Sequence, residues 1–204
     1  DDSLTAVSGS STMYGGAGSD TLRSSDNRNI LNGGSGNDHY FIDTPYANII
    51  DSGGIDAAYS NTSFVLAAEL EIGRLLGSAA ANLSGNLEAN LLVGNSADNL
   101  VSGGVGNDTL VGAKGNDDLY GGFGSDHFVF MSGDGQDTIS FLDLNGALGD
   151  KLDLRGHSQI TSFADLRQNH LTVSGYDLII KAGTDVITLV GVNLSDLDAG
   201  DFLF

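Results

Sequence analysis

The 204-residue sequence contains no cysteine, no tryptophan and a single proline, Pro45. No disulfide can therefore stabilise the fold, and thiols say nothing about the compartment. No apolar run approaches the ~20 residues that a membrane-spanning helix requires. The first ten residues, DDSLTAVSGS, do not form a secretory signal. Since the sequence starts in what already looks like repeat material, we expect it to be a piece of a longer protein.

Basic residues are also scarce, with 8 Lys and Arg against 27 Asp and Glu, which gives a net charge of −19. This balance argues against nucleic acid and against an anionic membrane surface as partners, and it favours the binding of cations. An acidic, Gly-rich chain can instead be disordered. Hydrophobic residues make up 40% of the sequence and recur at fixed repeat positions, which favours a folded chain.

Patterns typical of catalytic sites are missing as well. The four histidines, His39, His127, His157 and His170, are not spaced as in H-E-x-x-H or a comparable zinc motif. There is no G-x-S-x-G nucleophile motif, and no Gly-rich turn ends in the G-K-[ST] of a phosphate-binding loop. We therefore expect no enzymatic activity in this chain, while the activity of the parent protein stays open.

The clearest pattern is a run of three nine-residue units from residue 103 to residue 129: GGVGNDTLV, GAKGNDDLY and GGFGSDHFV. Each fits G-G-x-G-x-D-x-U-x, in which U is a large apolar residue, and only Ala113 departs from it. This nonapeptide is typical of a parallel β-roll that binds Ca²⁺. Glycines at positions one, two and four permit φ > 0 and bring backbone carbonyls close to a metal. The aspartate at position six supplies the hard oxygen ligand that Ca²⁺ prefers.

The nine-residue period predicts how the units stack. Positions seven to nine should form a short strand whose eighth residue points inward, here Leu110, Leu119 and Phe128. Two units make one coil, so residues that are eighteen apart in the sequence, such as Asp108 and Asp126, should lie above one another. At one strand spacing, ~4.8 Å, two carboxylates repel by about 1 kcal/mol even in water. A row of such pairs indicates a need for cations.

These units resemble the repeats-in-toxin family, also called haemolysin-type calcium-binding repeats. The resemblance implies Ca²⁺ bound between successive coils through Asp side chains and backbone carbonyls, about three to five ions in all. It also implies a secreted, extracellular protein that leaves the cell through type I secretion machinery. The metal ligands expected on this basis are Asp20, Asp38, Asp108, Asp117, Asp126 and Asp137, in turns formed by Gly16, Gly18, Gly34, Gly36, Gly104, Gly106, Gly115, Gly122 and Gly124.

Residues 1–60 form a first repeat block, in which Asp20 and Asp38 are one coil apart. Around Pro45 the period breaks, although Asp56 lies eighteen residues after Asp38 and permits a further site. Residues 61–102 form a connector followed by neutral coils, with Asn90 and Asn99 at position six, where we expect no strong Ca²⁺ site. Residues 64–76 fit either a helix or a strand by periodicity, and similarity to connectors of the family favours strands.

Residues 103–140 form the Ca²⁺-binding repeats. The unit SGDGQDTIS has Asp137 at position six, where it could pair with Asp117. Residues 141–204 are predicted to form a C-terminal cap with two short helices and three strands at 171–174, 177–181 and 185–190. Ser162 and Asp165 should cap one helix, and Ser195 and Asp198 the last helical turn. The final DFLF looks like a type I secretion signal, and the alternative is an edge strand that closes the roll.

The sequence thus predicts an all-β protein, a parallel β-roll with a C-terminal β-rich cap, that folds on Ca²⁺ binding after export and stabilises or exports a larger protein. One alternative is a module that binds an extracellular, alginate-like polysaccharide. It would need a cationic or aromatic stripe, whereas Arg23, Arg28 and Arg74 are scattered in the sequence. Another alternative is a Ca²⁺-dependent adhesin or surface-layer element.

Overall fold

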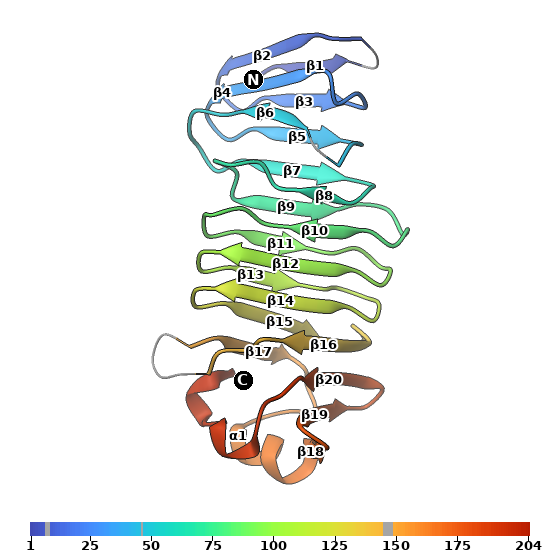
Figure 1. Cartoon of the computed structure of the whole chain (residues 1–204), viewed down its shortest axis with the longest axis vertical. Coiled ribbons are helices and arrows are strands. Elements are labelled where there is room, and N and C mark those ends of the chain that lie inside the picture. Colours follow the sequence, from blue (N-terminus) through green and yellow to red (C-terminus); the bar gives the residue numbers. More distant parts are fainter. Residues whose placement is uncertain (7–8, 46, 145–148) are drawn as a thin grey trace.

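The computed structural model describes residues 1–6, 9–45, 47–144 and 149–204. Short strands stack along one axis from the N-terminus to a smaller unit at the C-terminal end, and the helical turns are confined to that end (Figure 1). The chain is a parallel β-roll, as the sequence predicts. None of the described helices is long and apolar enough to span a membrane.

One side of the roll is a ten-stranded sheet in which each strand pairs in parallel with the strand one coil further on. Its strands, in order, are β1 (Ser3–Ala6), β3 (Thr21–Ser24), β5 (His39–Ile42), β7 (Ala57–Ser60), β9 (Ile72–Leu75), β11 (Leu91–Val93), β13 (Thr109–Val111), β15 (His127–Met131), β17 (Lys151–Gly156) and β21 (Phe202–Leu203).

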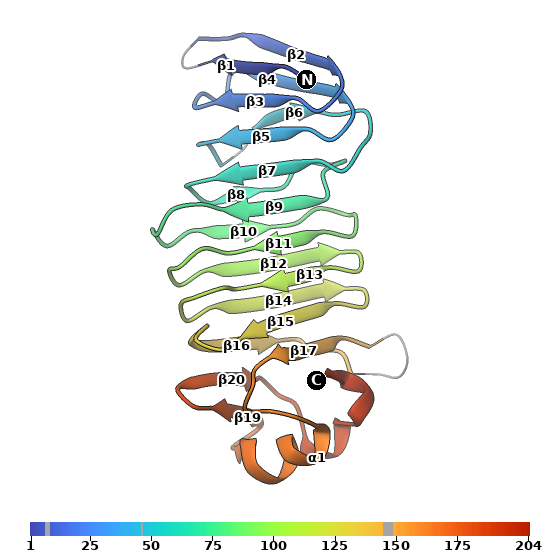
Figure 2. The same cartoon turned by 180° about the vertical axis from the view of Figure 1, so that it is seen from behind.

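The opposite side is divided into two sheets, and the view from behind shows both along the same axis (Figure 2). The first contains β2 (Thr12–Ala17), β4 (Ile30–Ser35) and β6 (Asn48–Ile50). The second has the order β18 (Leu171–Ser174), β19 (Asp177–Ala182), β20 (Asp185–Leu189), β16 (Gln136–Ser140), β14 (Asp118–Phe123), β12 (Leu100–Val105), β10 (Asn82–Ser84) and β8 (Phe64–Val65).

The strand register shows that two nonapeptides make one coil, because Leu22 pairs with Tyr40 and Leu110 with Phe128, each eighteen residues on. Side chains alternate along a strand, so every residue at position eight points into the roll. The inward residues of the repeats are all at most 1% exposed: Leu22, Leu31, Tyr40, Leu92, Val101, Leu110, Leu119, Phe128 and Ile139. They form one continuous core.

Residues 64–76 form two short strands, β8 and β9, and no helix, as the family resemblance favours. Leu66 and Leu70 between the strands are buried, and Glu69 takes a positive φ of 70° that turns the chain. The pairing of β7 with β9 joins Ala57 to Ile72, a step of fifteen residues by the numbering, so this coil is shorter than a repeat coil. The roll therefore runs through the connector without a break.

The cap contains α1 (Phe163–Asp165), η2 (Leu166–His170), the antiparallel strands β18, β19 and β20, and the turns η3 (Leu194–Asp196) and η4 (Ala199–Asp201). Ser162 accepts the Asp165 backbone N–H, as predicted. The predicted Ser195 and Asp198 cap is wrong: Asn193 with Asp196 caps η3 and Asp198 with Asp201 caps η4. Strand β21 pairs with β17 and lies at the edge of the long sheet, as the edge-strand alternative expects.

Candidate metal-binding turns

The glycine-rich turns nest against one another along the roll. Gly122 and Gly124 have φ of 111° and 141°, and a Cβ on either would overlap the carbonyl oxygen of Gly104 or Gly106 in the preceding coil. Only glycine allows this approach without strain. All the glycines predicted for these turns have positive φ: Gly16, Gly18, Gly34, Gly36, Gly104, Gly106, Gly115, Gly122 and Gly124. Ala113, at the second position, adopts a φ of 71°.

The aspartates at position six form ladders in which each carboxylate is tied to the coil before it. The Asp20 backbone N–H donates to Asp38 Oδ1 over 2.7 Å, and the Asp38 N–H donates to Asp56 Oδ1 over 2.7 Å. In the second block the same bond joins four further pairs, at 2.7–3.0 Å: Asn99 to Asp117, Asp117 to Asp137, Asn90 to Asp108 and Asp108 to Asp126. One oxygen of each carboxylate is thus satisfied by the backbone.

The second oxygen is the unusual feature of these ladders. Among the described residues, six Oδ2 atoms are buried with no hydrogen-bond partner: those of Asp20, Asp38, Asp56, Asp108, Asp117 and Asp126. A buried acceptor without a donor is costly, and more so when it is charged. Either a proton or a cation can remove this cost, and a hard cation suits carboxylate and carbonyl oxygens. The residues present therefore fit Ca²⁺.

The electrostatics of the ladders agree with this shortage of donors. Burial raises the pKa of Asp117 to about 6 and that of Asp137 to about 7. In both cases the backbone hydrogen bond from the preceding coil opposes the rise, and neighbouring carboxylates add to it. Burial also raises the pKa of Asp108 and Asp126. Without a cation, these turns hold protons more firmly than an exposed aspartate does.

The neutral turns provide a direct comparison within the same chain. Asn99 Oδ1 accepts the Asn95 backbone N–H, and its Nδ2 donates to the Ala81 carbonyl over 2.9 Å. Asn90 likewise accepts from the Asn86 N–H and donates to the Leu70 carbonyl. Both side-chain atoms of each asparagine are therefore paired with protein groups. These two turns require no ion to satisfy their position-six side chain.

Two ladder positions differ from the expected set. Asp56 continues the Asp20 and Asp38 ladder and has an unpaired Oδ2, although the period breaks before it. Asp137 stacks on Asp117 as expected, but its Oδ2 is not among the unpaired buried atoms. The other five expected aspartates have the unpaired oxygen.

Two further acidic residues of the turns escaped the sequence analysis. Asp150 extends a ladder, since the Asp126 N–H donates to its Oδ1 over 2.9 Å and the Asp143 N–H to its Oδ2. It follows Asp126 by 24 residues and so falls outside the period, but it precedes the inward Leu152 by two residues, as position six does. Asp51 lies beside Asp38 and Asp56 with ligand atoms within 4.8 Å of one another.

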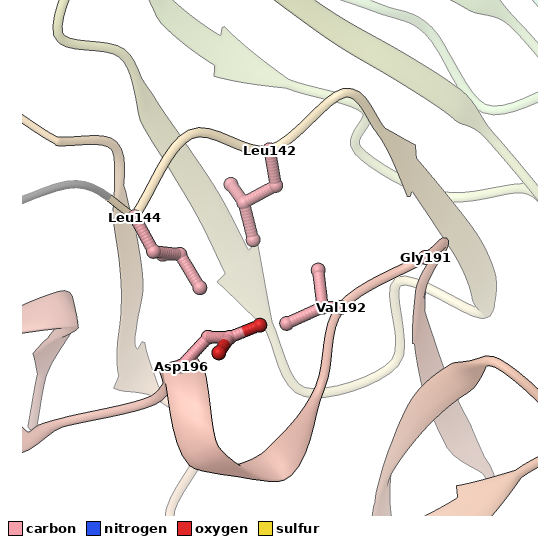
Figure 3. Close-up of a pocket in the computed structure, with 5 residues that line it drawn as sticks. All are labelled: Leu142, Leu144, Gly191, Val192 and Asp196. Carbon is pink, nitrogen blue, oxygen red and sulfur yellow. The ribbon is translucent and has the colours of Figure 1, made fainter.

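A separate hollow lies at the C-terminal end, between the segments that follow β16 and β20 (Figure 3). Leu142, Leu144, Gly191 and Val192 line it together with Asp196, whose carboxylate is bonded to Asn193 and Ser195. The leucine and valine side chains point toward one another, and the carboxylate is the one titratable group among these five residues (Figure 3). A single carboxylate that already accepts hydrogen bonds from Asn193 and Ser195 does not supply the acid and base pair of a catalytic site.

A match to a known repeat family covers the same turns. A model of the RTX calcium-binding nonapeptide repeat, in four copies, matches residues 1–40 and 84–128. These ranges include the turns of Asp20, Asp38, Asp108, Asp117 and Asp126. Among solved structures, the extracellular lipase LipA from Serratia marcescens is similar over 91% of this chain, with 15% identity and a TM-score of 0.43, and the chain spans 40% of the length of that protein. No curated protein matches the sequence.

Proposed function

Because the chain belongs to the repeats-in-toxin family of calcium-binding repeat proteins, we propose that it is a β-roll that folds when Ca²⁺ fills its turns outside the cell. The observation that carries this proposal is the set of six buried Oδ2 atoms without a donor, at Asp20, Asp38, Asp56, Asp108, Asp117 and Asp126. Repeat domains of this kind are generally non-catalytic, so we place any catalysis of the parent protein outside this chain.

The sites follow from the pairs of stacked carboxylates. We propose three to five ions, centred on Asp20 with Asp38, Asp108 with Asp126, and Asp117 with Asp137, together with the carbonyls of the nested glycine turns. The turns of Asn90 and Asn99 stay without strong sites. Anomalous scattering from crystals grown with calcium tests this assignment. Strong peaks beside the asparagine turns with none at Asp108 would contradict it.

The energetics support folding that depends on calcium. The strands are short, no disulfide joins the coils, and the stacked carboxylates repel, so conformational entropy should win in the metal-free chain. An ion that binds only the folded form contributes about 2.7 kcal/mol per site when its concentration is a hundred times Kd. For a Kd near the ~10⁻⁴ to 10⁻³ M of extracellular calcium modules, the sites fill only outside the cell.

This dependence suits export by type I secretion, because the chain would cross the channel unfolded and fold on arrival. On this proposal residues 1–60 and 103–140 hold the calcium turns, residues 61–102 lengthen the roll, and residues 141–204 cap it and carry the export signal. Secretion of the chain from cells with a type I exporter tests the last assignment. Removal of residues 201–204 should abolish export, and undiminished export would contradict the proposed signal.

One observation favours a second candidate function, the binding of an anionic, alginate-like polysaccharide. One row of paired positions on consecutive strands contains Arg23, Phe41, Tyr59 and Arg74. The two arginines are therefore on the same face of the fold, although they are far apart in the sequence. The Arg23 guanidinium lies 3.6 Å from the centre of the Phe41 ring, which stacks on Tyr59 with centroids 4.8 Å apart. Among the described residues neither arginine makes an ion pair with a carboxylate.

Calorimetry with alginate and with a neutral glycan tests this second function. Binding should be seen with alginate and should be lost in the double variant Arg23→Ala, Arg74→Ala. The matched control is Arg155→Ala, because Arg155 is already paired with Asp153. Absence of heat with either glycan would end this candidate without touching the calcium proposal.

A further inference from the structure

The turn before Asp56 departs from the repeat at positions one and two, where Asp51 and Ser52 replace glycines. Asp51 lies eighteen residues after Gly33, so it occupies the place of the first glycine of a repeat. At Gly33, Gly103 and Gly121 a Cβ would overlap the Oδ2 atom of the aspartate in the same turn. A side chain at this position therefore points at the position-six carboxylate, and here that side chain is itself a carboxylate.

Three buried carboxylates meet at this turn. Single oxygens of Asp38, Asp51 and Asp56 lie within 4.8 Å of one another, and the residues are 0%, 5% and 0% exposed. The Oδ2 atoms of Asp38 and Asp56 have no hydrogen-bond partner. Three negative charges at such distances, with two oxygens that lack donors, are unfavourable unless a cation or protons compensate them.

Asp51 is held in place by three donors. Its Oδ1 accepts the backbone N–H of Ser52 over 2.6 Å and that of Gly53 over 2.9 Å. Its Oδ2 accepts the hydroxyl of Tyr40, which replaces the usual leucine at the inward position. Oδ1 is saturated by its two N–H donors, whereas Oδ2, with a single donor, retains a second lone pair for a metal.

We propose that Asp38, Asp51 and Asp56 form a tri-carboxylate calcium site that binds more tightly than the repeat turns and fills before them. This inference rests on the proposed calcium-dependent folding, and it specifies which site the first ion occupies. The affinity of calcium sites is set by the number of charged ligands and by rigidity. A repeat turn stacks two carboxylates, whereas this turn brings three together and fixes the third with backbone and tyrosine donors.

The position of the site gives it a role in assembly. Asp38 precedes β5 and Asp56 precedes β7, the last repeat strand before the shortened coil that leads to β9. The Asp56 backbone N–H donates to Glu71 Oε2 over 2.7 Å, which ties the same turn to the connector. An ion bound here would join the first repeat block to the connector, at the point where the nonapeptide period is interrupted.

Calcium titration of the full chain by calorimetry tests the proposal. The unsubstituted chain should show one tight site ahead of a weaker class. Asp51→Asn keeps the shape but removes the charge, and should raise the Kd of the tight site by about tenfold or more while leaving the weaker class unchanged. Asp51→Gly restores the repeat residue, so it is compatible with the fold and should convert the tight site into one of the weaker class. Asp43→Asn, which removes a charge from an exposed residue of the same block, should change neither class.

Terbium provides an independent readout. Excitation of tyrosine should sensitise emission from Tb³⁺ bound at this turn, because the Tyr40 hydroxyl contacts Asp51. The emission that develops at the lowest Tb³⁺ concentrations should be lost in both Tyr40→Phe and Asp51→Asn. Identical isotherms for Asp51→Asn and the unsubstituted chain would overturn the tri-carboxylate site and leave the repeat sites standing. No calcium heat from the unsubstituted chain would overturn the proposed function as well.

Discussion

Asp117 and Asn99 occupy the same place in successive coils and differ by one atom, an oxygen in place of an amide nitrogen. The Asn99 nitrogen donates to the Ala81 carbonyl, whereas Asp117 Oδ2 has no partner. Both residues keep the bond that joins the coils, since the Asn99 N–H donates to Asp117 Oδ1 and the Asp117 N–H to Asp137 Oδ1. The backbone geometry of the roll is thus shared, and the need for a cation is decided by the side chain.

Asn99→Asp should replace the amide nitrogen that donates to the Ala81 carbonyl with a buried carboxylate oxygen that has no donor. In calcium-free buffer we expect it to reduce the free energy of unfolding by about 1–3 kcal/mol, the cost of a buried acceptor left unpaired. Calcium-free buffer at pH 7 with a stabilising sulfate salt keeps the new carboxylate ionised and favours the metal-free fold, and urea denaturation there measures this change. Asn107→Asp is the matched control, because Asn107 is exposed and its Oδ1 acceptor for the Ser125 N–H is kept. Equal losses for both variants would mean that added charge alone accounts for the effect.

The coil is the element that the sequence reveals most directly, because its two halves repeat every nine residues. Leu110, Leu119 and Phe128 are each fully buried, and their pairing partners lie one coil away. The inward positions and the stacked aspartates were predictable for this reason, and the strands of the cap from their own alternation of apolar and polar residues between short turns. They depend on local spacing alone, which insertions elsewhere in the chain do not disturb.

Features that depend on coils of unequal length were not predictable. Asp150 stacks on Asp126 after 24 residues, and Arg74 follows Tyr59 in register after 15, so neither shows the period of eighteen. Asp51 was not predictable for another reason, since a carboxylate in the place of the first glycine indicates an interrupted repeat and not an additional ligand. Pairing of the strands, which the sequence does not display, is what brings these residues together.

Each coil contributes little apolar area, so single inward residues should matter strongly. Leu119→Ala should reduce the free energy of unfolding in saturating calcium by about 2–5 kcal/mol, as large-to-small changes in a close-packed core do. Leu91→Ala serves as the control, because Leu91 is 38% exposed on β11 of the opposite sheet. Thermal denaturation in calcium compares the two, and a Leu119→Ala loss no larger than that of Leu91→Ala would contradict a continuous core through the repeats.

At the scale of the whole molecule, the chain carries a net charge of −19 and concentrates its buried charge in the ladders. Burial raises the pKa of Asp56 and Asp117 to about 6 and that of Asp137 to about 7 in the metal-free fold, against about 3.9 in an unfolded chain. The folded form therefore binds more protons than the unfolded form between about pH 4 and pH 7. Its stability without calcium must fall as the pH rises through that range.

The calcium-stripped chain should accordingly hold more β-structure near pH 4.5 than at pH 8. In calcium the trend should reverse, because protons compete for the same oxygens and the calcium midpoint should rise as the pH falls. Circular dichroism of stripped and calcium-loaded samples across this range measures both trends. A stripped chain that gains structure toward pH 8 would contradict the assignment of protonated carboxylates to the metal-free fold.

The central claim is that calcium decides whether this chain is folded, and far-ultraviolet circular dichroism during a calcium titration at neutral pH tests it most directly. We predict the spectrum of a largely unfolded chain in excess chelator and a cooperative change to a β-sheet spectrum as the ions fill the ladders. A full β-sheet spectrum in chelator that millimolar Ca²⁺ leaves unchanged would contradict the account.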